Sequence, residues 1–128
     1  MSQRSALQMY NQIDVQGKIV NASPHRMVQI LFENAIDRIG KAKNAMLAQN
    51  IHDKGQYISM AITIIDGLQS SLDHKLGGDV AANLDKLYDY MTRSLLEANL
   101  ENQVEKLDEV VKLLREIKSG WDQISDAE

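Results

Sequence analysis

The chain has 128 residues, one proline and no cysteine, and its formal net charge is −4 at pH 7. This length allows one domain with a real hydrophobic core, and the lack of cysteine excludes disulfides and thiolate metal ligands. The acidic balance argues against a nucleic-acid partner. The sequence contains no apolar run of about 18 residues, so no membrane-spanning helix is predicted. Residues 1–18 also lack the apolar block of a signal peptide. The composition favours an acidic, cytoplasmic protein with a single domain, residues 1–128.

Residues 1–22 differ from the rest of the chain, because their few apolar side chains are spread among glutamine, asparagine and serine. Leu7, Tyr10 and Ile13 are the apolar positions of interest, and Gly17 weakens any helix that runs through the segment. We expect a mobile N-terminal segment, a short helix or flap that either lies across the body or swings free. The helical body is predicted to cover residues 23–125.

The first long helix is predicted over residues 24–49. Ser23 suits the N-cap and Pro24 suits the first helical position, where no amide donor is needed. Its apolar stripe consists of Val28, Leu31, Phe32, Ala35, Ile39, Ala42 and Met46, and Met27, Ile30 and Ile36 lie beyond it. The apolar arc is therefore wider than the ~100° of a simple surface helix.

Residues 50–55 are predicted as a connection, and the next helix is predicted over residues 56–74. Its stripe consists of Ile58, Ala61, Ile62, Ile65, Leu68 and Leu72, with Tyr57, Met60 and Ile64 as a second flank. On a helical wheel these positions span roughly 200°. Such a helix is either central in a bundle or contributes to an open groove.

The next helix follows a predicted break, at which Gly77 and Gly78 end one helix and Asp79 caps another. Its stripe consists of Val80, Leu84, Leu87, Tyr88, Met91, Leu95 and Ala98. Asn102 and Glu105 resemble a capping box for a last helix. Four long amphipathic helices with short connections predict an all-α fold, an antiparallel up-down four-helix bundle with an additional short N-terminal helix or flap.

The sequence offers no catalytic or metal-binding pattern. Helical di-iron sites need Glu-x-x-His, and none of His25, His52 and His74 has a glutamate three residues before it. These histidines are interpreted as surface residues. Ser70 lies near His74, but nothing marks the orienting group and the oxyanion hole that a nucleophile needs. We therefore expect no enzyme, no cofactor and no bound metal.

The apolar surface of the two central helices exceeds what a four-helix core requires. Most of these residues are expected in the core, and the remainder can form a groove for an external helix. The sequence does not separate the two groups among the groove candidates Met27, Ile30, Leu31, Asn34, Ile58, Ala61, Ile62, Ile64, Ile65 and Leu68. Leu87, Tyr88, Met91, Leu114 and Trp121 are assigned to the core. An alternative function is a homodimeric structural module that uses the same surface.

Several short motifs are spread in order along nearly the whole chain. Taken together, they resemble the motifs of the FliS family of flagellar export chaperones. They are Tyr10, Ala22-Ser23-Pro24, Leu31-Phe32-Glu33-Asn34-Ala35, Leu72-Asp73, Gly77-Gly78-Asp79, Leu87-Tyr88-Asp89-Tyr90-Met91, Ala98-Asn99, Glu109-Val110, Leu113-Leu114 and Trp121. Asn21, Phe32 and Asn34 depart from the residues common in the family, which bears on partner preference.

The resemblance implies a cytoplasmic chaperone that binds the disordered C-terminal segment of flagellin. Such a protein prevents premature filament assembly and hands flagellin to the type III export gate, where the component FlhA is an implied partner. The segment that contains Leu7, Tyr10 and Ile13 is implied as a cap over the groove, with Tyr10 as the switching residue. A weak homodimer is also compatible with the exposed apolar surface.

Overall fold

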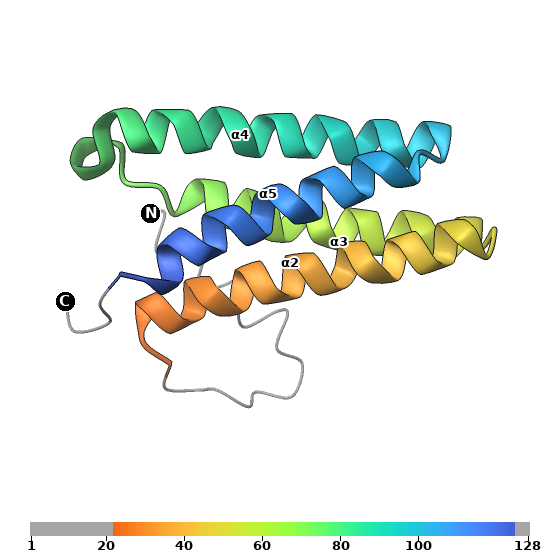
Figure 1. The fold of residues 1–128 in the computed structure, drawn as a ribbon, viewed down its shortest axis with the longest axis horizontal. Coiled ribbons are helices and arrows are strands. Elements are labelled where there is room, and N and C mark those ends of the chain that lie inside the picture. The colour runs from red at the N-terminus through yellow and green to blue at the C-terminus, as the bar shows by residue number, and fades with distance from the viewer. Residues whose placement is uncertain (1–21, 125–128) are drawn as a thin grey trace.

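The computed structural model describes residues 22–124, so the predictions for Leu7, Tyr10 and Ile13 lie outside the described residues. Within this range the chain forms four helices and no strand (Figure 1). The helices are α2 (Pro24–Leu47), α3 (Ile51–Ser70), α4 (His74–Glu101) and α5 (Val104–Asp122). Consecutive helices run antiparallel along one long axis (Figure 1).

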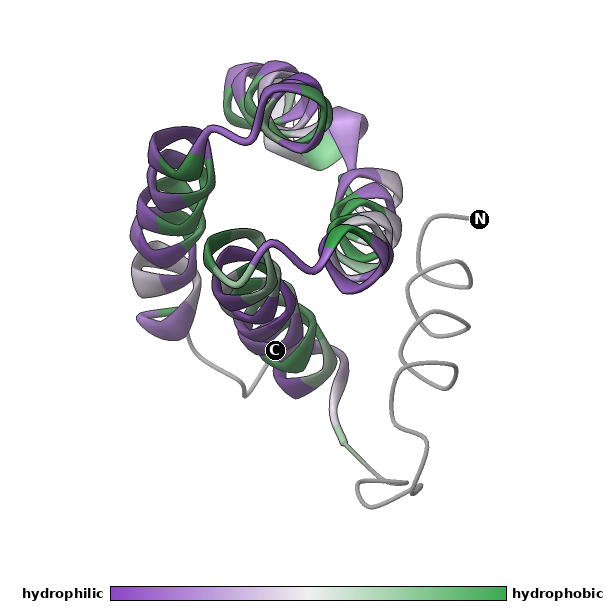
Figure 2. Cartoon of the chain, turned by 90° about the vertical axis from the view of Figure 1, so that its right-hand side faces the viewer, coloured by the Kyte–Doolittle hydropathy of each residue, from purple (hydrophilic) through white to green (hydrophobic). Residues whose placement is uncertain are grey.

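The four helices form a square bundle when viewed along their axes (Figure 2). α2 packs on α3 and α5, and α4 packs on the same two helices. The helices at opposite corners do not approach each other closely. The predicted four-helix bundle is confirmed for the described residues, whereas the additional N-terminal helix falls outside them.

The start of α2 agrees with the prediction. Ser23 is the N-cap, its hydroxyl oxygen accepts a hydrogen bond from the Arg26 amide at 3.1 Å, and Pro24 follows at the first helical position. Ser accepts a hydrogen bond from one of the free amides at a helix start, and Pro has no amide that needs a partner, which is why this boundary is readable from sequence.

The predicted connection over residues 50–55 is wrong, because α3 already begins at Ile51. Asn50 is its N-cap, and the side-chain oxygen of Asn50 accepts from the Asp53 amide at 3.1 Å. Asp53 also places a carboxylate in the first turn, where the helix dipole favours negative charge. The link between the two helices is therefore only three residues long, from Ala48 to Asn50.

α4 begins before the predicted break. Its N-cap is Asp73 rather than Asp79, and one Asp73 carboxylate oxygen accepts from the Lys75 and Leu76 amides. The predicted interruption at the glycine pair is present as a kink, since Gly78 has φ 51° and ψ −125°. That positive φ is open to glycine and costly for residues with a Cβ.

The predicted capping box of Asn102 and Glu105 is wrong. Asn102 ends α4 in the left-handed conformation, with φ 54° and ψ 47°, which is a usual way for a helix to terminate. The N-cap of α5 is Gln103, whose side chain makes no capping hydrogen bond. The Asn102 side chain is instead engaged by Lys54 of α3.

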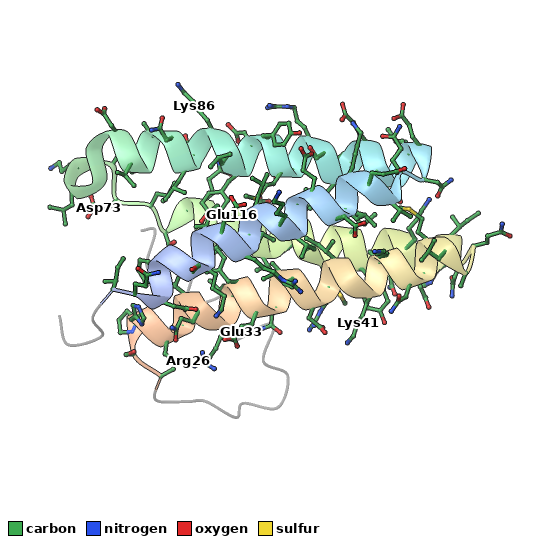
Figure 3. All side chains as sticks on the ribbon, in the orientation of Figure 1. Arg26, Glu33, Lys41, Asp73, Lys86 and Glu116 are labelled. Atoms are coloured by element: carbon green, nitrogen blue, oxygen red, sulfur yellow. The ribbon has the colours of Figure 1, made fainter. Side chains whose placement is uncertain are left out.

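The core is built from apolar residues of all four helices. Of the residues assigned to it from sequence, Tyr88, Met91 and Leu114 are buried, and Leu87 and Trp121 are partly buried and pack against it. The core cluster is Leu31, Phe32, Ala35, Ile39, Ala42, Met46, Ile58, Ala61, Ile64, Ile65, Leu68, Tyr88, Met91, Leu95, Ala98, Leu107, Val110 and Leu114. Charged side chains such as Lys41, Lys86 and Glu116 cover the outside (Figure 3).

Candidate binding surface

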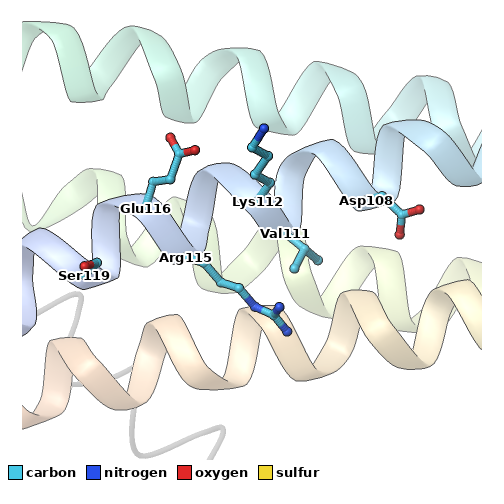
Figure 4. A pocket seen from close by; sticks show the side chains of 6 residues that line it. All are labelled: Asp108, Val111, Lys112, Arg115, Glu116 and Ser119. Atoms are coloured by element: carbon cyan, nitrogen blue, oxygen red, sulfur yellow. The ribbon is translucent and has the colours of Figure 1, made fainter.

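The described residues contain no group of three or more histidine, aspartate and glutamate side chains that could hold a metal ion. None of their helices combines the length and apolar character needed to cross a membrane. One open hollow of about 430 Å³ lies on α5, with Asp108, Val111, Lys112, Arg115, Glu116 and Ser119 around it (Figure 4). Four of its six lining residues are charged and the hollow is open to solvent, unlike the enclosed pockets that hold small molecules.

His25 is a packing residue, which corrects its interpretation as a plain surface histidine. Its ring stacks on Trp121, with the ring centroids 4.9 Å apart and the planes 13° from parallel. The Trp121 indole N–H donates to the His25 carbonyl at 3.0 Å, and His25 Nε2 lies 2.9 Å from the Trp121 carbonyl. These contacts join the start of α2 to the end of α5.

Most of the predicted groove residues are buried. Buried are Ile30, Leu31, Ile58, Ala61, Ile64, Ile65 and Leu68. Met27, Asn34 and Ile62 are partly exposed, and the Asn34 amide donates to the carbonyl of Ile30 at 3.0 Å. The described surface therefore presents only three of the predicted positions, and a role of any of them in partner binding stays a prediction.

A buried lysine joins α3 to α4 at one end of the bundle. Lys54 is only 6% exposed, yet its ammonium donates to the Asn99 carbonyl at 2.9 Å and to Asn102 Oδ1 at 2.7 Å. The carbonyls in the last turn of a helix lack partners within the helix. Lys54 thus satisfies one of them, and it secures the residue that ends α4.

A second polar contact joins the same two helices near the other end. The Gln69 side-chain amide donates to Asp85 Oδ1 at 2.7 Å and to Asp89 Oδ1 at 2.9 Å. Together with the Lys54 contacts, this defines the antiparallel register of α3 and α4. Within the described part of the chain, no hydrogen bond or ion pair joins the two helices between these contacts.

Apolar side chains are exposed along this stretch. Leu96 and Leu100 lie one turn apart on α4 and are 49% and 83% exposed. The register places Leu100 level with Gly55 and Leu96 level with Ser59, about one helical turn before Ile62, which is partly exposed. A Cβ on Gly55 would meet no atom within 4 Å, so the surface there is open. Ile51, 76% exposed, lies at the start of α3.

Carboxylates occupy the other half of the same surface. Asp89 lies two helical turns before Leu96, so both residues point to the same side of α4, and Asp66 of α3 lies level with Asp89 in the register. Burial, together with the repulsion of Asp89, raises the pKa of the Asp66 carboxyl above its usual value. Among residues 22–124, no ion pair involves Asp66, Asp85 or Asp89.

We call this surface the α3–α4 face. Its apolar half consists of Ile51, Gly55, Ile62, Leu96 and Leu100, and its acidic half consists of Asp66, Asp85 and Asp89. Of these residues only Ile62 was among the predicted groove positions. Leu96 was missed because the predicted stripe of this helix contains its neighbour Leu95, and Leu96, turned about 100° from Leu95 around the helix, was not considered as a surface residue.

The family model described as "Flagellar protein FliS" matches residues 6–128. The chain belongs to the FliS family. It is 45% identical over 120 residues to "Flagellar secretion chaperone FliSB" of Pseudomonas aeruginosa, covering 94% of this chain and 95% of that protein. It is 45% identical to "Flagellar secretion chaperone FliS" of Vibrio cholerae, covering 94% and 89%, and 41% identical to that of Salmonella typhimurium, covering 94% and 90%. These relatives are named as flagellar secretion chaperones. The resemblance to the FliS family that was inferred from the sequence motifs is confirmed.

Proposed function

We propose that this FliS-family protein is a cytoplasmic export chaperone that binds the disordered C-terminal segment of flagellin. By covering that segment it prevents premature polymerisation, and it delivers flagellin to the export gate component FlhA. The observation that carries the proposal is the row of exposed apolar side chains, Leu96 and Leu100 among them, beside a core that is already complete. Exposed apolar side chains that lie together on one face are typical of surfaces that bind another chain.

Simple energetics support this role. Each Å² of apolar surface that a client buries contributes about 25 cal/mol, while the ordering of a disordered client reduces the net affinity. The chaperone can thus bury the apolar face of the flagellin segment, which is the same burial that drives polymerisation, and the complex remains reversible.

The predicted groove and its cap belong to the same proposal. We propose that the partly exposed residues Met27, Asn34 and Ile62 contact the client, and that the N-terminal segment around Tyr10 covers the groove when no client is bound. A segment of the same chain competes at a high effective concentration, which lowers non-specific binding. Tyr10→Ala is expected to leave the melting temperature unchanged and to alter flagellin binding; a large loss of melting temperature would make Tyr10 structural instead.

The direct test is calorimetric titration of the purified protein with a synthetic peptide of the last ~40 residues of its cognate flagellin, a length suited to a disordered client. The expected result is saturable one-to-one binding with a negative heat-capacity change, the mark of apolar burial. Absence of heat at several temperatures, with the protein folded, would contradict the proposal. Sedimentation of the free protein would then reveal whether the alternative, a homodimeric module, holds.

A further inference from the structure

We propose that the α3–α4 face binds an amphipathic helix of the client that carries a lysine or arginine beyond its apolar anchors. The apolar anchors lie on Leu96 and Leu100, and the basic side chain reaches the carboxylates of Asp66 and Asp89. This inference rests on the proposed function and deepens it, because it assigns a surface and a chemical pattern to one client segment.

The apolar half provides the anchoring. Leu96, Leu100 and Ile51 are exposed hydrophobic residues. The register places all three within about one helical turn of the level of Gly55, which has no side chain to fill the space there. A surface seam between two helices, with apolar residues along it and one glycine, lets a third helix approach closely. Between the levels of Gly55 and Gln69 the seam is about 20 Å long, which matches a client helix of about four turns.

The acidic half selects the charge of the client. Gln69 holds Asp85 and Asp89 beside α3 through hydrogen bonds of 2.7 Å and 2.9 Å. Asp66 lies close enough to feel the Asp89 charge, and none of the three carboxylates has a cationic partner among the described residues. A lysine or arginine delivered by the client relieves this repulsion and forms charge-assisted hydrogen bonds.

The separation of the two halves defines a spacing in the client. Leu96 and Asp89 are two turns apart on α4, about 10 Å along the axis. A client helix that lies along the seam therefore has its basic residue about seven positions from an apolar anchor. This spacing can be looked for in the peptide that binds.

A second copy of the chain fits this face poorly. A two-fold interface places the same surface on both partners. If the two faces ran antiparallel, the carboxylates of one copy would be buried against Leu96 and Leu100 of the other, at a high desolvation cost. If they ran parallel, the carboxylates would face each other. A basic amphipathic helix avoids both penalties.

The test compares the wild-type protein with the double variant Asp66→Asn, Asp89→Asn, which removes charge and keeps shape. Glu116→Gln, on the exposed side of α5, is the matched control. Binding of the ~40-residue flagellin peptide is measured at low and high salt. We expect the double variant to bind roughly fivefold to tenfold more weakly at low salt, with a smaller difference at high salt. The control variant should match the wild type.

The outcomes separate this inference from the proposed function. If the wild-type protein does not bind the peptide, the proposed function fails. If the wild type binds and the double variant binds equally or more tightly at both salt concentrations, the inference fails alone. Peptides with single Lys→Gln or Arg→Gln changes complete the test, because one of them should lose affinity for the wild type but not for the double variant.

The position of the client on this face has its own readout. Leu96→Ser is expected to weaken peptide binding about tenfold through lost apolar burial, with an unchanged helical circular dichroism spectrum. Unchanged affinity would place the client elsewhere on the bundle and overturn the inference.

Discussion

Two seams of this bundle are built differently. The α2–α5 seam is closed by side-chain contacts at several levels: the stack of His25 on Trp121 lies at one end, and Lys43 pairs with Asp108 at 2.9 Å toward the other. Between them, Lys118 Nζ lies 3.9 Å from a carboxylate oxygen of Glu33.

Among residues 22–124, the polar bridges of the α3–α4 seam lie near its two ends, at Lys54 and Gln69. Between them the leucines of α4 remain exposed. Residues that are joined across a seam stabilise the fold, whereas exposed apolar residues beside the buried core, with no polar bridge across them, are available to a partner.

The largest effect on the fold is expected from Trp121→Ala in the α2–α5 seam. The variant loses the ring stack on His25, the indole hydrogen bond and apolar packing, which should lower the free energy of unfolding by about 3 kcal/mol. Denaturant unfolding measures the loss. Trp121→Phe keeps an aromatic ring and should lose only about 1 kcal/mol; equal losses for both variants would mean that the stack contributes little.

The next largest effect is expected from Lys54→Met in the α3–α4 seam. The substitution keeps much of the side-chain length but leaves the Asn99 carbonyl and the Asn102 side chain without their donor, at a cost of about 2 kcal/mol. Lys43→Met removes an exposed ion pair from the other seam and should cost less than about 1 kcal/mol. A loss no larger for Lys54→Met than for Lys43→Met would show that the buried bridge is not needed to close the α3–α4 seam.

A smaller effect is expected from Leu96→Ser with Leu100→Ser on the α3–α4 face. Because both side chains are exposed and lie outside the core, the free energy of unfolding should change by less than about 0.5 kcal/mol. Thermal unfolding followed by circular dichroism checks this. A clear destabilisation would mean that the two leucines are part of the fold and not of a partner surface.

The smallest effects, of opposite sign in the two seams, are expected from pH. A hydrogen bond from Lys118 lowers the pKa of the Asp122 carboxyl. The ionised Asp122 carboxylate therefore stabilises the fold at pH values above the ordinary aspartate pKa, and this stabilisation is lost as pH falls through the lowered pKa. The raised pKa of Asp66 means that its charge opposes folding near neutral pH. Protonation of Asp66 relieves this opposition as pH falls through the raised pKa toward the ordinary value of 3.8.

Carboxyl-carbon NMR titration distinguishes the two residues. Asp122 should titrate below the ordinary aspartate range and Asp66 above it. At pH 7, Asp122→Asn should be slightly less stable than the wild type, and Asp66→Asn at least as stable as the wild type. If Asp66 titrated below the ordinary range, a cation would already be paired with it and the acidic half would not be open to a client.

The helical class, the start of α2 at Ser23 and Pro24, the interruption at the glycine pair and the family could all be predicted from the sequence. These features are local or periodic. A cap depends on residues within one turn, and a left-handed backbone favours glycine. A stripe of apolar residues indicates which side of a helix is buried. The ordered motifs of the family needed no contact information either.

Long-range packing was needed to establish which apolar residues remain exposed and which residues cap the ends of α3, α4 and α5. Ile58 and Leu96 are both apolar residues on amphipathic helices, but one is buried and the other lies in an unbridged part of a seam. Asn102 ended α4 and did not start α5, and its side chain is held by Lys54 from a distant part of the chain. Periodicity fixes the direction of a side chain around its own helix, whereas burial depends on the neighbour that packs there, and that neighbour is set by long-range contacts.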